Sequence, residues 1–172
     1  MKRHISKLIA AHWLFGILCV ALAGCSTADN EMAAGNLTSV NHVDGTAITW
    51  FSVNGYRASG GGGETCCIIL PVKWRPGLMA NVEWEVDPDR WMKLPSVTSP
   101  EFQAAYAKHA ANYQRYTSTV EIPEYQEKRC GLTVHFLPCQ QVKVTTSCWA
   151  VSAPQYPIKD PLRMKEPDVC TK

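Results

Sequence analysis

Apolar and polar residues alternate with a period of two along much of the chain, a pattern typical of strands with one buried face. Residues 79–86 show it well, because Val82, Trp84 and Val86 fall on one face. A segment rich in β-branched and aromatic residues, 47–53, is followed by Asn54-Gly55, a strong signal for a two-residue hairpin turn. Strands are predicted on these grounds, and from a compact apolar run, at residues 47–53, 65–70 and 79–86.

A second hairpin is predicted near the end of the alternating region. Residues 132–136 and 142–145 each alternate apolar and polar positions, and a Pro-Cys-Gln sequence supplies the turn between them. If the hairpin is centred on Cys139, then Cys130 and Cys148 lie opposite each other. A disulfide between them would close the open end of the hairpin, provided that their Cβ atoms are suitably spaced.

One segment departs from the period of two and predicts a helix at about residues 99–116. Ser99 is a suitable N-cap, Pro100 takes the first helical position and Glu101 places an acid in the first turn. Its aromatic and histidine residues recur every three or four positions and form one stripe: Phe102, Tyr106, His109, Tyr113 and Tyr116. The stripe either packs on a sheet or presents tyrosines to a partner. The predicted fold is a small antiparallel β-sandwich with one inserted α-helix.

The N-terminus has the pattern of a secretory signal at residues 1–24. A short basic segment precedes an apolar run at 8–23, which is shorter than the ~20 residues that a membrane-spanning helix needs. Leu22-Ala23-Gly24-Cys25 resembles the lipobox of bacterial lipoproteins. That resemblance implies cleavage before Cys25 and lipidation of this residue, and Ser26 after it favours the periplasmic face of the outer membrane.

The rest of the chain divides into a polar tether at 25–39, a β-rich domain at 40–152 and an extended, proline-rich tail at 153–172. Removal of the signal leaves 14 basic and 15 acidic residues, so the formal charge of +2 becomes about −1. A nearly neutral domain of this kind does not predict nucleic-acid binding.

Six cysteines remain besides Cys25, and an oxidising compartment favours up to three disulfides among them. Cys170 would hold the tail to the domain, and Cys139 could pair with Cys66 or Cys67. The disulfide candidates are Cys66, Cys67, Cys130, Cys139, Cys148 and Cys170.

A search for catalytic or metal-binding patterns yields none that is specific. There is no Gly-x-Ser-x-Gly, and the Gly60 to Gly63 run lacks the phosphate-binding spacing and is interpreted as a loop. A nucleophilic pair of Cys67 and His135 is conceivable, but His135 is expected to point outward from its strand. A zinc site is not expected, because adjacent cysteines in a strand point to opposite faces. We therefore predict no enzyme activity, no cofactor and no metal.

Several short motifs are spread over residues 40 to 150. Those of the first part are Phe51-Ser52-Val53-Asn54-Gly55-Tyr56, Gly60 to Gly63, Cys66-Cys67, Leu70-Pro71, Trp74, Pro76-Gly77, Val82 and Trp84. With these motifs, the chain is similar to uncharacterised Gram-negative lipoproteins that share a domain of unknown function. A later stretch, residues 134–144, resembles the closing hairpin of that family.

The resemblance extends to immunity proteins of type VI secretion effectors of the phospholipase class, and it implies no catalytic residues. It therefore predicts an immunity protein that binds and inhibits such an effector. The alternatives are a structural or assembly lipoprotein of the envelope, and an enzyme with an unrecognised site. Aromatic and arginine side chains are common anchors of protein interfaces, and the candidates here are Trp74, Arg75, Arg90, Trp91, Tyr106 and Tyr113.

Overall fold

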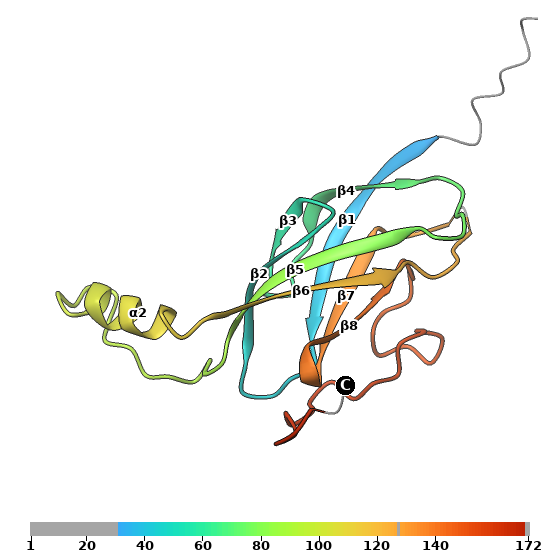
Figure 1. Ribbon diagram of the computed structural model, residues 1–172. Helices are drawn as coiled ribbons and strands as arrows, with labels where there is room; N and C mark the ends of the chain where they lie inside the picture. Colours follow the sequence, from blue (N-terminus) through green and yellow to red (C-terminus); the bar gives the residue numbers. More distant parts are fainter. Residues whose placement is uncertain (1–30, 127, 171–172) are drawn as a thin grey trace, which may run out of the picture. The chain divides into compact units, whose positions relative to one another are not determined.

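The computed structural model describes residues 31–126 and 128–170 (Figure 1). The predicted signal at residues 1–24 and the predicted lipidation site, Cys25, lie outside the described residues. Within the described part of the chain, no helix has both the length and the apolar character needed to cross a membrane.

Two four-stranded sheets pack face to face, as the predicted sandwich requires. The first sheet has the order β4-β1-β7-β8 and the second the order β3-β2-β5-β6. All neighbouring strands are antiparallel except β1 and β7, which are parallel. The strands are β1 Met32–Asn41, β2 Ala47–Val53, β3 Tyr56–Ser59, β4 Thr65–Pro71, β5 Met79–Asp87, β6 Gln114–Glu121, β7 Leu132–Leu137 and β8 Gln141–Thr145.

An aromatic cluster joins the two sheets at the centre of the core. The Trp84 ring on β5 lies 5.4 Å from the Phe136 ring on β7 and 5.6 Å from the Tyr116 ring on β6, measured between centroids. Phe51 on β2 meets the edge of Phe136 at 5.7 Å. In β5 the buried Ala80, Val82 and Trp84 alternate with the exposed Asn81 and Glu83, so the period of two in the sequence marks the buried face of this strand.

The predicted strands and both hairpins are confirmed. The turn between β2 and β3 has Asn54 at φ 50° and Gly55 at φ 86°, which is the left-handed pair that a two-residue hairpin turn uses. The second hairpin turns at Pro138–Gln140, where Cys139 and Gln140 have φ of 60° and 56°. Gly60, in the glycine run, lies so close to β2 that a Cβ atom at this position would overlap the Ile48 carbonyl.

The prediction of a tether at residues 25–39 is wrong from Met32 onward. Residues 32–41 form β1, which pairs with β4 on one side and β7 on the other. The segment lacked a strand signal because only Leu37 and Ser39 are buried in it, while most of its other side chains are small or polar. Main-chain hydrogen bonds to the strands on both sides hold β1 in the sheet, and these bonds do not depend on the type of side chain.

The predicted helix is real but shorter than residues 99–116. Helix α2 spans Phe102–Ala110 and has Glu101 at its N-cap, so the prediction of Ser99 as N-cap, with Pro100 and Glu101 in the first turn, is wrong. The Ser99 hydroxyl instead accepts from the Glu101 backbone N–H in the turn before the helix. Tyr116 lies in β6, opposite Trp84 of β5. The helix ends early because β6 completes the second sheet, and pairing with β5 is incompatible with a helical backbone.

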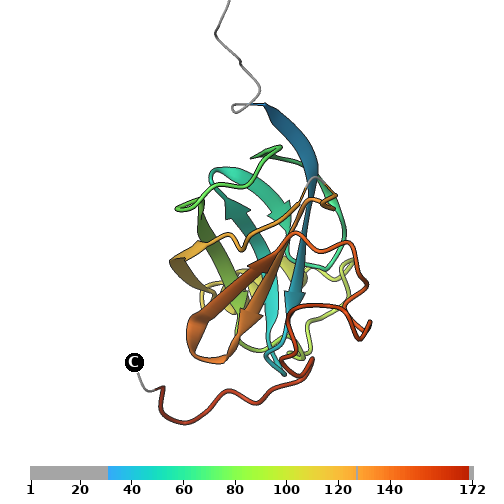
Figure 2. The ribbon, with the colours of Figure 1, turned by 90° about the vertical axis from the view of Figure 1, so that its right-hand side faces the viewer.

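The C-terminal segment, residues 153–170, contains no helix or strand, as its prolines predicted. It nevertheless packs along the outer face of the first sheet (Figure 2). Met164 forms a parallel bridge with Val43, and the Lys143 ammonium on β8 pairs with Asp160 at 2.6 Å. The buried ring of Tyr156 adds apolar packing to these contacts.

Two predictions about the cysteines are confirmed and two are wrong. Cys130 and Cys148 form a disulfide across the end of the β7–β8 hairpin, with Cα atoms 4.9 Å apart. Cys170 does hold the C-terminal segment, but its partner is Cys139 in the hairpin turn. Pairing of Cys139 with Cys66 or Cys67 is therefore wrong. The expectation that Cys66 and Cys67 diverge is also wrong, because their sulfur atoms lie against each other.

Candidate functional site

The six predicted partner-binding residues do not form one surface. Trp74 and Arg75 precede the start of β5 at Met79, whereas the other four follow its end at Asp87. Nine residues of extended strand cover roughly 30 Å. The structure thus divides the candidates between two ends of the sandwich, and Figure 1 shows α2 beyond one of them.

Trp74 has a structural role at its end of the sandwich. Its ring packs against the core, and its indole N–H donates to the Ile122 carbonyl at 2.8 Å. Arg75 beside it is exposed. A tryptophan whose polar atom is already bonded to the backbone is typical of a buried anchor of the fold. Trp74 is therefore the weakest of the six candidates for partner binding.

The other four candidates lie in the segment between β5 and β6, which we call the 88–113 insertion. It carries an unusual share of the exposed apolar side chains: Trp91 is 68% exposed, Val97 75%, Tyr106 43% and Met92 42%. The Arg90 guanidinium lies 4.7 Å from the centroid of the Trp91 ring, a cation–π contact on the surface.

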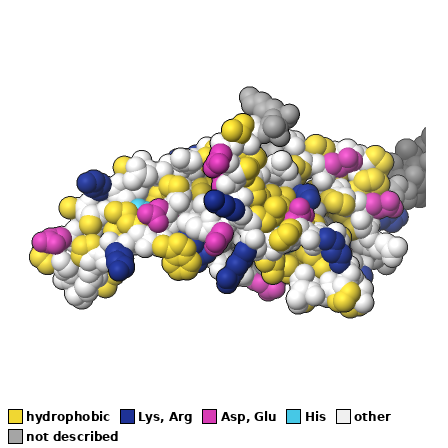
Figure 3. Space-filling view, turned by 90° about the horizontal axis from the view of Figure 1, so that it is seen from below, with side chains coloured by type: hydrophobic (Ala, Val, Ile, Leu, Met, Phe, Trp, Pro, Cys, Tyr) yellow, Lys and Arg dark blue, Asp and Glu magenta, His cyan; other side chains and the backbone are white. Residues whose placement is uncertain are grey.

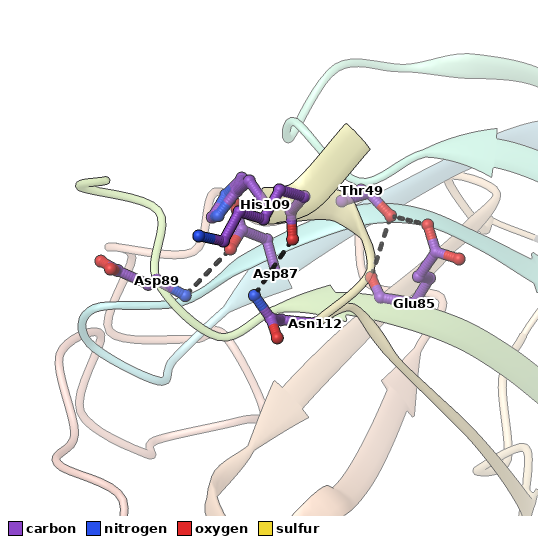
Figure 4. Close-up of polar contacts among 7 residues, drawn as sticks. Thr49, Glu85, Asp87, Asp89, His109 and Asn112 are labelled. Carbon is purple, nitrogen blue, oxygen red and sulfur yellow. Dashed lines mark hydrogen bonds and ion pairs between the residues drawn. The ribbon is translucent and has the colours of Figure 1, made fainter. Parts of the chain in front are cut away.

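A buried polar pair holds the insertion to the sheet. The His109 ring on α2 and the Asp87 carboxylate at the end of β5 meet at 3.0 Å between Nε2 and Oδ2, and both residues are buried (Figure 4). The other Asp87 oxygen accepts from the Asp89 backbone N–H at 2.9 Å. Burial, with the Asp87 charge and Tyr106 nearby, raises the pKa of Tyr113 to about 12.

Sequence reasoning placed His109 on the helix stripe but missed its partner. The two residues are 22 positions apart, and nothing local in the sequence marks an aspartate at a strand end as the acceptor for a later histidine. The pair can fix the direction in which α2 leaves the sheet, because a charge-assisted hydrogen bond is both strong and directional.

The outer face of the second sheet carries a small charged and aromatic cluster. The Arg57 guanidinium lies 4.0 Å from the Trp50 ring centroid, and the Arg115 guanidinium lies 5.6 Å from it. Arg115 also pairs with Glu85 at 2.8 Å, which lowers the pKa of that carboxyl. The cluster therefore contains both positive and negative charges. On the face drawn in Figure 3, basic and acidic side chains are likewise interspersed with hydrophobic ones.

A buried chain of hydrogen bonds links the first sheet to the C-terminal segment. Nδ1 of His42 lies 2.7 Å from the Pro161 carbonyl, which can only accept, so this nitrogen carries a proton. With both rings neutral, Nε2 of His42 then accepts from Nδ1 of His135 at 2.7 Å, and Nε2 of His135 accepts from the Tyr156 hydroxyl at 2.6 Å. The tautomers of both rings are therefore fixed by their partners.

His135 was predicted to face outward on β7, and it does, yet it is completely buried. The C-terminal segment covers that face, which the alternation within the strand could not reveal. Burial, followed by the neighbouring His42, lowers the pKa of His135 to about 4. The conceivable nucleophilic pair with Cys67 is not present, since both His135 ring nitrogens are hydrogen-bonded to other residues, His42 and Tyr156.

A cavity of about 300 Å³ opens between the two sheets at the end of the sandwich from which the insertion leaves. Its apolar lining comes from both sheets, and its polar lining comes from the β1–β2 turn, the start of β6, the β7–β8 turn and the C-terminal segment. None of its residues was singled out from the sequence as a site, because they converge from five separate stretches of chain. The lining includes Ile48, Trp84, Val86, Tyr116, Phe136, Asn41, Asp44, Thr46, Gln114, Gln140 and Glu166.

The comparisons with known proteins identify a family. Residues 40–144 match a family described as protein of unknown function (DUF3304). No curated protein and no solved structure matches the chain. The matched stretch, which covers more than half of the chain, runs from the end of β1 to β8 and includes the insertion, the aromatic core and all of the cavity-lining residues except Glu166. The chain therefore belongs to the DUF3304 family.

Proposed function

We propose that this protein is a lipid-anchored, periplasm-facing binding protein, and that it acts as an immunity protein by inhibiting a phospholipase effector of type VI secretion. The observation that carries the binding role is the exposure of Trp91, Val97, Tyr106 and Met92 on a single insertion. Clustered exposed apolar side chains are typical of protein interaction sites. The immunity role rests on the resemblance described for the sequence.

The insertion has the composition of a protein interface. Aromatic residues, methionine and arginine are enriched at interface centres, and Trp91 with its stacked Arg90 combines two of the side chains that most often dominate binding energy. Phe102 and Tyr106 stack at 5.9 Å on α2 and add a second aromatic pair. Inhibition by a binder needs only a surface that covers the active site of its target.

The His109–Asp87 pair supports this role because it limits how far the insertion can reorient. A segment that is held before binding loses less conformational freedom when it docks. The exposed side chains of the insertion are thus presented from a fixed base, even though the insertion contributes little to the core.

Membrane anchoring would place such an inhibitor where a phospholipase acts. Because β1 starts at Met32, only seven residue steps separate it from Cys25, and covalent geometry limits their reach to about 25 Å. The domain would therefore remain close to the bilayer, which raises its effective concentration toward an enzyme working on that surface.

The test is to express the product of the adjacent gene in the periplasm with and without this protein. We expect toxicity that the full chain relieves, and a complex of the two proteins on co-purification. The double variant Trp91→Ala/Tyr106→Ala should lose both rescue and complex. Trp149→Ala is the matched control, because Trp149 is 57% exposed but lies outside the insertion, and it should retain both.

The outcomes separate the parts of the proposal. A complex without relief of toxicity would support binding but overturn the immunity role. A complex that forms equally well with the double variant would overturn the insertion as the binding surface. Cys25→Ser should abolish rescue and leave the soluble complex intact, which tests the anchor by itself.

A further inference from the structure

The cavity at the end of the sandwich has an apolar floor, which the folded core forms without a ligand. Trp84 and Phe136 stand side by side in the core, and the half-buried Tyr116 flanks Trp84. Ile48 and Val86 complete the floor from β2 and β5. With about 300 Å³ of space, the cavity could hold roughly ten water molecules, or a small organic ligand of similar volume.

The rim of the cavity is fixed by hydrogen bonds that do not involve a ligand. The Asn41 side chain donates to the Val43 and Thr46 carbonyls and accepts from the Val43 backbone N–H, which shapes the β1–β2 turn. That turn is tied to the C-terminal segment, because the Asp44 N–H donates to Met164 at 2.8 Å. It is tied to the insertion as well, since the Gly45 carbonyl accepts from Arg90. A site of this kind needs little reorganisation on binding.

The charged side chains that line the cavity are acidic. Asp44 and Glu166 line the rim, and among the described lining residues there is no lysine or arginine. No hydrogen bond or ion pair joins the Asp44 carboxylate to another described residue. Glu166 uses one oxygen to accept from the Cys139 backbone N–H at 2.8 Å, which leaves the other available.

From the aromatic floor and the two carboxylates we infer that this cavity binds a small organic ammonium ion, a cationic nitrogen on a short apolar body. Aromatic faces attract such cations through their negative ring centres, and this is how quaternary ammonium groups are recognised in proteins. Anions would be repelled by Asp44 and Glu166. The inference is independent of the proposed function, which concerns the exposed surface of the insertion.

The experiment compares two probes of equal shape on the full chain. Choline carries the cationic nitrogen, and 3,3-dimethylbutan-1-ol is its neutral isostere, with carbon in place of nitrogen. We expect choline to bind about tenfold more tightly, which corresponds to the usual strength of a cation–π contact. Binding is followed by chemical shifts of backbone amides. We expect the signals of residues 44–46 and Gln114 at the rim to move, and those of the β4–β5 connection to stay in place.

Two matched variants test the charge. Asp44→Asn removes a rim carboxylate and should weaken choline binding about threefold while leaving the alcohol unchanged. Asp89→Asn makes the same change on an exposed residue that does not line the cavity, and it should alter neither affinity. Equal binding of the two probes would overturn the inference, as would no binding of choline. Shifts confined to another part of the surface would overturn it too.

Discussion

The two segments that leave the sheets are attached to them in opposite ways. The C-terminal segment places Tyr156 in the interior at 2% exposure, bonds to two buried histidines and ends in a disulfide. The 88–113 insertion buries His109 but leaves Trp91 at 68% exposure. The C-terminal segment buries the ring of Tyr156 in the interior, whereas the insertion exposes the ring of Trp91 to solvent. The comparison indicates that the fold depends on the first, whereas the proposed binding role would depend on the second.

The largest expected effect comes from truncating one large aromatic side chain in each segment. Tyr156→Ala should lower the free energy of unfolding by about 3–5 kcal/mol, because it leaves a cavity and removes the donor to His135. Trp91→Ala removes a larger side chain but should change stability by less than about 0.5 kcal/mol, since that side chain is exposed. Urea unfolding of both variants gives the two values, and equal losses would contradict the comparison.

The second effect is a dependence of stability on pH that originates beneath the C-terminal segment. The pKa of His135 is about 4 in the folded protein, below its ordinary value of 6.5. Between these values the unfolded chain binds a proton that the folded protein does not, so stability is complete above about pH 6.5 and falls as the pH drops toward 4. The loss from this residue should be about 3 kcal/mol.

The measurement is the free energy of unfolding between pH 4 and pH 7, taken from urea titrations at each pH. His135→Gln keeps a polar side chain at the position but does not titrate. The variant should therefore take up one proton fewer on unfolding, and its free energy of unfolding should change less steeply with pH. An unchanged slope would assign the acid sensitivity to other groups.

The smallest expected effect concerns the base of the insertion. His109→Ala removes the bond to the buried Asp87 carboxylate and should cost about 1–3 kcal/mol. Because the insertion has few other attachments, we expect faster protease cleavage within residues 88–113. Lys108→Ala, an exposed neighbour on α2, serves as the control and should cleave at the wild-type rate. Equal cleavage in both variants would show that the pair does not hold the insertion.

Local sequence determined most of the β elements and one disulfide. Alternation fixed the inward faces of β5, β7 and β8, β-branched and aromatic composition marked β2, and Asn54-Gly55 fixed the first hairpin turn. The pairing of Cys130 with Cys148 followed from hairpin symmetry. These features depend on residues that are neighbours along the chain or directly across one turn, so a short stretch of sequence contains the information for each.

Only the tertiary structure decided what covers each strand and which distant side chains meet. β1 belongs to a sheet because β4 and β7 lie on either side of it, and its own residues give little signal. His135 is buried because a segment about twenty residues later lies over it. The cavity draws on five separate stretches of chain. Burial and cavity formation depend on which surfaces pack together, and residues far apart in sequence determine this jointly.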